Sequence, residues 1–215
     1  MRILDLATWE RARAFESFTS HCERPHFALC GNVDITALRP YLKARGVPFT
    51  SGMVYIVSRA ANGVREFRYR VVEGKPVEHE TVNPAITLLN DDESLSFYVF
   101  PFDPDFGAFA DACAAAREDG PPPRADRSQR GRRGGILMCS TIPWISFTTM
   151  THPAFSAEDA TPRIAWGKFW PEGERIKLPL SVQVHHGMMD GVHVGRFWQQ
   201  VEAFCADPET LLGGD

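Results

Sequence analysis

The chemically richest part of the chain is the segment SVQVHHGMMDGVHVGRF, which spans Ser181 to Phe197. A run rich in β-branched residues ends at His185 and His186, a turn containing glycine follows, and Asp190 precedes the next apolar stretch. Because side chains alternate along a strand, the two histidines point to opposite faces, so at most one enters a given cleft. Histidine titrates near neutral pH, which suits a general base that takes a proton from an alcohol or thiol and later returns it.

Three other interpretations of this segment compete with catalysis. Either histidine could be an ordinary core or surface residue, and Asp190 could pair with a cation to hold the turn rather than orient a base. His185, His186, Asp190 and His193 also supply the ligand types of zinc. The opposite-facing histidine pair does not match the i, i+4 spacing of HExxH, however, so we expect no metal.

The elements that position these residues follow from hydrophobic periodicity. Three-to-four spacing predicts helices, alternation predicts strands, and Gly-containing turns between alternating runs predict hairpins. Helices are predicted over 8–18, 49–64, 106–116 and 192–204; strands over 26–35, 86–89, 95–100, 136–140, 144–149, 163–169 and 176–184; and a hairpin around 73–76. This order predicts an α/β fold, a two-layer sandwich with a mixed β-sheet. Residues 1–215 are expected to form a single domain, with a mobile loop at about 120–135.

Composition excludes several classes of protein. The 215 residues are 44% hydrophobic and 23% charged, which is typical of a globular protein rather than a disordered one. The formal net charge of −4 would not attract nucleic acid or an anionic membrane. Five cysteines without a CxxC pair indicate neither a disulfide framework nor structural zinc. No apolar run has membrane-spanning length and no signal peptide is visible, so we expect a cytoplasmic protein.

One segment favours a different class of function. Residues 117–133 contain six Arg against three acidic residues, a local net charge of +3. A non-catalytic or nucleic-acid-binding protein is therefore the remote alternative, although solvated charged loops of this kind are common.

Several segments carry a family resemblance. HHGMMDGVHVGRF closely resembles the HHxxxDG signature of the chloramphenicol acetyltransferase family. Over nearly the whole chain, and in the family's order, further segments are similar to family segments: WERARAFESF, FALCGNVDIT, EFRYRVVEGKPV, TVNP and STIPWISFTT. Related signatures occur in peptide-synthetase condensation domains and in 2-oxoacid dehydrogenase acyltransferase cores, but the former are much longer and the latter carry lipoyl-bearing segments.

The resemblance implies a fold, a reaction and site residues. The fold would be of the CoA-dependent acyltransferase type. Acetyl would pass directly from acetyl-CoA, the co-substrate, to an acceptor hydroxyl in a homotrimer with active sites between subunits, without a metal or prosthetic group. His186 would be the general base and Ser140 would bond the tetrahedral oxyanion. Asp190 would form an ion pair with Arg11, and Trp144 would lie beside the CoA channel.

The acceptor region departs from the family's pattern. Where chloramphenicol-modifying members tend to carry Tyr, Phe, Ala, Thr and Tyr, this chain has Phe18, Leu95, Phe97, Ala165 and Phe169. Together with Phe27, these residues are expected to line the acceptor and CoA channels. The resemblance favours chloramphenicol as acceptor, and a different small alcohol, amine or thiol is the alternative.

Overall fold

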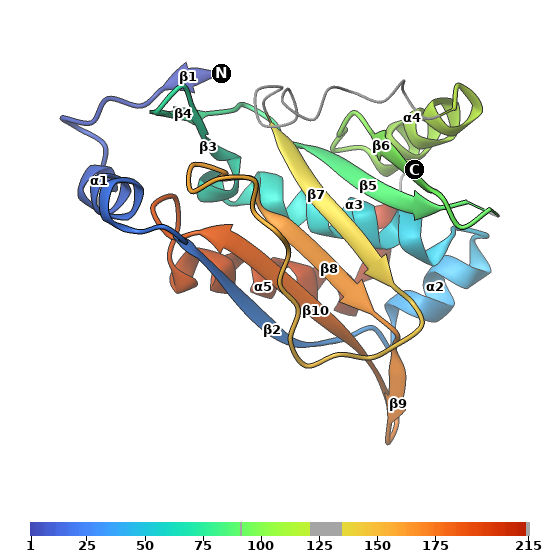
Figure 1. Cartoon of the computed structure of the whole chain (residues 1–215). Helices are drawn as coiled ribbons and strands as arrows, with labels where there is room; N and C mark the ends of the chain where they lie inside the picture. The colour runs from blue at the N-terminus through green and yellow to red at the C-terminus, as the bar shows by residue number, and fades with distance from the viewer. Residues whose placement is uncertain (91, 121–134, 214–215) are drawn as a thin grey trace.

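The computed structural model describes residues 1–90, 92–120 and 135–213, so most of the predicted loop at 120–135 lies outside the described residues. Six α-helices, one 3-10 helix and ten strands are present in the described part (Figure 1). The helices are α1 (Ala12–His21), α2 (Leu38–Ala44), α3 (Phe49–Gly63), η1 (Arg65–Arg68), α4 (Phe106–Glu118), α5 (Gly191–Ala206) and α6 (Pro208–Leu212). The strands are β1 (Arg2–Ile3), β2 (His26–Asp34), β3 (Tyr69–Val72), β4 (Lys75–Glu78), β5 (Asn83–Leu89), β6 (Leu95–Val99), β7 (Ile136–Ile142), β8 (Arg163–Gly167), β9 (Trp170–Glu172) and β10 (Arg175–His185).

A seven-stranded sheet forms the centre of the molecule. Its strand order is β2-β10-β8-β7-β5-β6, and β9 pairs with β10. The pairs β5–β7 and β7–β8 are parallel and the remaining pairs are antiparallel. The predicted α/β fold with a mixed sheet is therefore confirmed.

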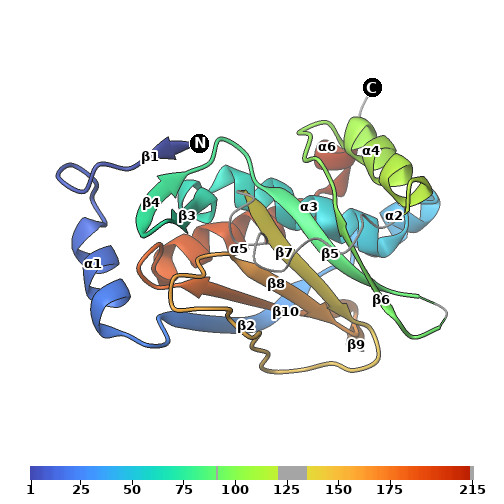
Figure 2. The same cartoon turned by 45° about the horizontal axis from the view of Figure 1, so that its top comes forward.

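One face of this sheet is covered by α3 and α5, as Figure 1 and Figure 2 show from two directions. The helix predicted over residues 49–64 is confirmed by α3, in which Met53, Tyr55 and Ile56 are fully buried. Strand β2 and helix α5 pack closely, since a Cβ on Gly31 of β2 would lie 3.0 Å from the ring of Trp198 on α5. Glycine at this position lets the edge strand pack directly against the helix.

The opposite face of β10 is covered by the segment 143–162, which connects β7 to β8. Ser181 Oγ of β10 donates to the carbonyl of Met150 (2.9 Å), which fixes this segment on the sheet. The predicted strand over 144–149 is wrong. Because β7 and β8 are parallel neighbours, the chain must cross back along the sheet between them, and this return uses the residues that alternate like a strand.

The small sheet β1-β4-β3 and α1 lie beyond the end of β10 (Figure 1). Trp9 packs here against Phe15 and Tyr69. Helix α1 begins at Ala12 and not at residue 8, because the carbonyl of Asp5 accepts the amides of Thr8 and Trp9 in a separate turn. This arrangement brings the start of α1 next to the turn that follows β10.

Candidate active site

The two histidines at the end of β10 have different environments. His185 is fully buried: its Nδ1 accepts the amide of Gly187 (3.0 Å) and its Nε2 lies 2.9 Å from the carbonyl of Ala157. Because Nδ1 accepts, Nε2 carries the proton and the ring is neutral. Burial, followed by the neighbouring His26, lowers the pKa of His185 to about 4. His185 therefore anchors the segment 143–162 on the sheet.

His186 lies on the other side of the strand end, between two aromatic rings. Phe18 of α1 stacks on its imidazole with ring centroids 4.4 Å apart, and Phe27 of β2 lies tilted at 4.9 Å. The backbone amide of His186 donates to the carbonyl of Pro25 (2.6 Å). The side chain remains 40% exposed while its Nδ1 atom is buried. The exposed edge of the ring is therefore the one that carries Nε2.

The buried nitrogen of His186 faces a carboxylate. Its Nδ1 lies 3.2 Å from Oδ1 of Asp190, an ion-pair distance without hydrogen-bond geometry. The negative charge favours a proton on Nδ1, which leaves the lone pair of the neutral ring on the exposed Nε2. In this arrangement the exposed Nε2 can accept a proton, as a general base must.

Arg11 fixes this carboxylate from the N-terminal side. Its Nη1 donates to Oδ2 of Asp190 (2.6 Å), and its Nη2 donates to Oδ1 (3.0 Å) and to the carbonyl of His186 (2.9 Å). The ion pair implied by the family resemblance is thus present. The hydrogen bond from Arg11 is the main reason that the pKa of Asp190 lies below its usual value. The pair ties α1 to the turn after β10 and keeps the carboxylate ionised.

Ser140 lies far from His186 in the same chain. Along the sheet, Ser140 pairs with Ala165 and Ala165 pairs with Ser181, two strands away. His186 follows Ser181 by five positions, so strand geometry places the two Cα atoms about 19 Å apart. One chain therefore does not bring this hydroxyl to this imidazole.

The remaining predicted residues fall into separate places. Phe18 and Phe27 contact His186. By strand pairing, Leu95, Phe97, Ser140 and Ala165 face the side of the sheet that carries the segment 143–162. Trp144 is exposed on that segment. Phe169 packs against Phe49 and under Arg39 beyond the end of β8. Within one chain the predicted site residues thus form no single cluster.

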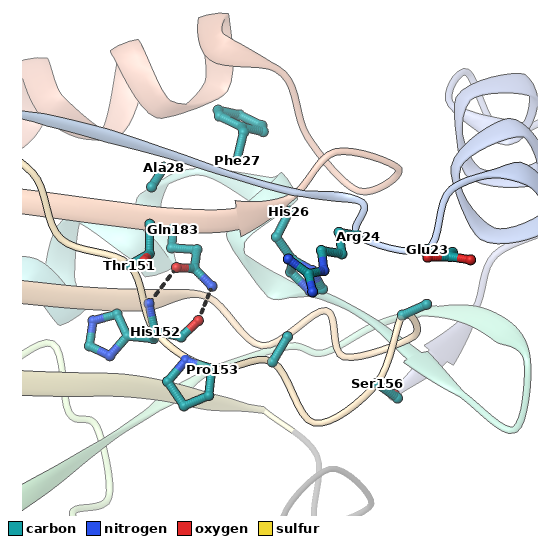
Figure 3. A pocket seen from close by; sticks show the side chains of 12 residues that line it. Glu23, Arg24, His26, Phe27, Ala28, Thr151, His152, Pro153, Ser156 and Gln183 are labelled. Carbon is teal, nitrogen blue, oxygen red and sulfur yellow. Dashed lines mark hydrogen bonds between the residues drawn. The ribbon is translucent and has the colours of Figure 1, made fainter.

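A cavity of about 520 Å³ opens between the start of β2 and residues 151–157 (Figure 3). The amide of Gln183 supports it by bonding the backbone of His152 twice, at 2.7 and 2.9 Å. Figure 3 shows His26 on the cavity side of β2 and the ring of Phe27 on the other side. The cavity is lined by Glu23, Arg24, His26, Phe27, Ala28, Thr151, His152, Pro153, Ala154, Ser156, Ala157 and Gln183.

Sequence reasoning missed most of this lining. The alternation of β2 is a signal that places His26 and Ala28 on one face, but the segment that closes the cavity carries no periodic pattern that predicts where it lies. The cavity volume falls in the range that accepts a small organic ligand.

Known proteins share this fold. The sequence profile described as chloramphenicol acetyltransferase matches residues 1–202. The chain belongs to the chloramphenicol acetyltransferase family. It is 30% identical over 204 residues to chloramphenicol acetyltransferase 2 of Escherichia coli, covering 94% of this chain and 95% of that protein.

Two further relatives agree with the assignment. A chloramphenicol acetyltransferase of Clostridium perfringens is 28% identical over 216 residues, covering 98% of this chain and 97% of the relative. A solved structure of a chloramphenicol acetyltransferase superposes with a TM-score of 0.86 at 28% identity, over 95% of this chain and all of that one. This member of the family is an acyltransferase.

In the described part of the chain, no group of three or more His, Cys, Asp or Glu side chains is placed to hold a metal ion. Among the helices at residues 1–90, 92–120 and 135–213, none combines the length and apolar character needed to cross a bilayer.

Proposed function

We propose that this protein transfers the acetyl group of acetyl-CoA to a hydroxyl of chloramphenicol, with His186 as general base. The observation that carries the proposal is the setting of the His186 ring. Phe18 and Phe27 hold it, its Nδ1 faces the ionised Asp190, and its Nε2 edge is open. These are the features that a proton acceptor for an alcohol needs.

The reaction needs one proton to move twice. The acceptor hydroxyl gives its proton to Nε2 of His186 as its oxygen attacks the thioester carbonyl, and a tetrahedral oxyanion forms. Collapse of this intermediate breaks the C–S bond, and the proton on Nε2 passes to the leaving CoA sulfur. The products are the acetyl ester and free CoA, and the base is regenerated. During the step that protonates the ring, Asp190 balances the imidazolium charge across 3.2 Å.

The oxyanion donor in this proposal is Ser140, and it has to come from another copy of the chain. Within one chain the serine and the base are about 19 Å apart. We therefore infer that the active sites lie between subunits, in the homotrimer that the family resemblance implies. Trp144, Ile145 and Phe155 on the segment 143–162 are 63%, 58% and 65% exposed in the single chain, and an interface would cover such apolar side chains.

The acceptor would lie between two copies, where the exposed Nε2 edge of His186 from one chain meets the face of the other chain's sheet that carries both Ser140 and the cavity beside β2. The size of this cavity suits chloramphenicol, while the polar groups of Arg24, His26 and His152 leave room for the alternative, a different small alcohol, amine or thiol. The proposal places the enzyme in the cytoplasm, where acetyl-CoA is available.

The test is release of free CoA thiol from acetyl-CoA by the purified full-length protein, with chloramphenicol, other alcohols, amines and thiols supplied in turn. We expect chloramphenicol to give the highest kcat/KM and an O-acetylated product by mass spectrometry. A different acceptor with a higher kcat/KM would replace chloramphenicol in the proposal. Absence of release with every acceptor would contradict acetyl transfer itself.

A further inference from the structure

The turn that presents His186 is also held from a second side, at the start of α5. Arg11 holds the side chain of Asp190, but the backbone of Asp190 has another partner: its amide donates to Nδ1 of His193 at 2.9 Å. His193 lies one turn into α5, and its side chain is 12% exposed.

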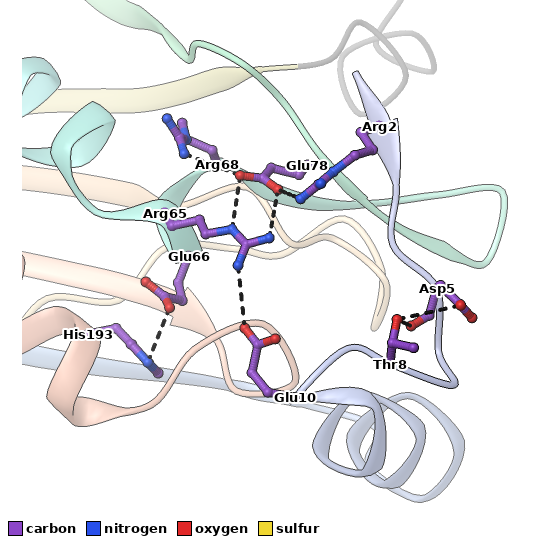
Figure 4. A network of polar contacts seen from close by, with 9 residues as sticks. All are labelled: Arg2, Asp5, Thr8, Glu10, Arg65, Glu66, Arg68, Glu78 and His193. Carbon is purple, nitrogen blue, oxygen red and sulfur yellow. Dashed lines mark hydrogen bonds and ion pairs between the residues drawn. The ribbon is translucent and has the colours of Figure 1, made fainter.

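The proton of the His193 ring is fixed by this contact. Because Nδ1 accepts the Asp190 amide, it carries no proton, and the ring proton is on Nε2. Nε2 lies 3.4 Å from Oε1 of Glu66, whose side chain is also only 12% exposed (Figure 4). Burial is the main cause that lowers the pKa of His193. Glu66 and Asp190 raise this pKa, Arg11 and Arg196 lower it, and the net lowering favours the neutral ring that this geometry requires.

Glu66 is itself held in place by its neighbours on η1. The ring of Phe67 stacks on Phe197 of α5 with centroids 4.7 Å apart. Arg65 donates to both carboxylate oxygens of Glu78 at 3.1 Å, as Figure 4 shows. The carboxylate that faces His193 is therefore carried by a short helix anchored to both α5 and β4.

We propose that His193, oriented by Glu66, is a positioning residue for the catalytic base, because it fixes the backbone of Asp190 and thereby the carboxylate that faces Nδ1 of His186. This inference rests on the proposed function, in which His186 acts as the base. It assigns Glu66 and His193 a role in turnover although neither touches substrate. His193 of α5 holds the backbone of Asp190, and Arg11 at the start of α1 holds its side chain. The two contacts together limit the motion of Asp190.

The variants separate the two contacts of His193. His193→Asn keeps an acceptor oxygen near the position of Nδ1 and removes the contact with Glu66. His193→Leu removes both contacts at similar volume. Glu66→Leu removes the orienting carboxylate without changing α5, so it tests the proposal even if His193→Leu does not fold. Glu202→Gln, which removes an exposed carboxylate from α5, is the matched control.

Two measurements are made on each full-length variant. The first is kcat and KM in the thiol-release assay. A misplaced reacting group costs up to about 100-fold, so we expect kcat to fall about 10- to 100-fold in His193→Leu with KM nearly unchanged. The kcat of His193→Asn should return most of the way to that of the unaltered protein. The kcat of Glu66→Leu should lie between those of His193→Leu and His193→Asn, and the kcat of the control should match the unaltered protein. Equal kcat in His193→Leu and the unaltered protein, or no recovery in His193→Asn, would overturn the proposal.

The second measurement does not depend on activity. Hydrogen–deuterium exchange of the peptide that spans residues 186–193 reports the protection of the Asp190 amide. We expect faster exchange in His193→Leu and near-normal exchange in His193→Asn; unchanged exchange in His193→Leu overturns the inference. If the unaltered protein releases no thiol with any acceptor but exchange responds as expected, the proposed function fails and the link from His193 to Asp190 stands.

Discussion

Arg11 and Asp190, separated by 179 positions in the sequence, form a two-pronged ion pair in which each terminal nitrogen of the guanidinium reaches a different carboxylate oxygen, at 2.6 and 3.0 Å. The same guanidinium bonds the carbonyl of His186 at 2.9 Å. A single side chain thus fixes the backbone of the proposed base and the carboxylate that faces it. The pair belongs to the proposed site and also joins the start of α1 to the start of α5.

Arg11→Ala should lower both stability and turnover. Removing one partner of a buried pair costs about 3–5 kcal/mol, and because the Asp190 side chain is partly solvated we expect about 2 kcal/mol in urea unfolding. Arg11→Lys keeps the positive charge but cannot bond both carboxylate oxygens in the same planar geometry. Compared with Arg11→Ala, it should therefore restore more of the lost stability than of the lost kcat. If Arg11→Ala keeps full kcat and the midpoint of unfolding, the pair has neither role.

Ser140→Ala should reduce kcat more than it raises KM for acetyl-CoA. One oxyanion donor is worth about 100-fold in kcat, measured in the thiol-release assay. An effect confined to KM would contradict the role in the oxyanion site.

A mixed oligomer tests whether Ser140 and His186 come from different chains. In random hybrids of Ser140→Ala and His186→Ala protomers, about a quarter of the inter-subunit sites would hold both unaltered residues. We expect co-refolded hybrids to regain up to about a quarter of full activity, well above the residual activity of either parent. Hybrids no more active than the parents would place the site within one chain and contradict the proposed assembly.

Phe18→Tyr should change the binding of the acceptor rather than the rate of the chemical step. The ring would still stack on His186, while its hydroxyl would restore a polar group that chloramphenicol-modifying members tend to carry at this position. We expect KM for chloramphenicol to fall and kcat to stay within about 3-fold. Phe18→Ala, which removes the stacked ring, should lower kcat instead. The same KM in Phe18→Tyr as in the unaltered protein would show that position 18 does not contact the acceptor.

Stability should fall as the pH drops from about 6.5 to about 4. Burial lowers the pKa of His79 and of His185 to about 4 from a usual 6.5. Between these values the unfolded chain binds protons that the folded chain excludes, so acid favours unfolding, by about 3 kcal/mol for each histidine at most. Below pH 4 this contribution levels off. Urea unfolding at pH 7 and pH 5 measures it.

His79→Asn should remove about 2 kcal/mol of the difference in unfolding free energy between pH 7 and pH 5, because the substituted side chain binds no proton. The exposed His21→Asn is the control and should leave the difference unchanged. An unchanged difference in His79→Asn would show that this histidine is not buried in its neutral form.

Local patterns predicted the elements that position the base. The apolar residues of α3 and of α5 and the β-branched run before His185 are signals within one element, and the structure follows them closely. Alternation also predicted that His185 and His186 would differ, and one is indeed buried while the other is partly open. The pairing of Arg11 with Asp190 came from the family resemblance, since no local pattern joins residues so distant in sequence.

Features that depend on the pairing of distant strands could not be predicted from the sequence. The separation of Ser140 from His186 follows from two strand pairings that no single segment encodes. Residues 144–149 alternate like a strand but serve as the return crossover, because β8 is parallel to β7 and leaves no free edge beside it. The cavity beside β2 is closed by this crossover, whose backbone at His152 is bonded to Gln183.

Release of CoA thiol by His186→Ala, compared with the unaltered protein at saturating acetyl-CoA and chloramphenicol, tests the central claim most directly. We expect kcat to fall at least about 100-fold, the usual effect of removing a general base, with unchanged circular dichroism and unfolding midpoint. Turnover by a folded His186→Ala variant at the rate of the unaltered protein would contradict the assignment of His186 as the base.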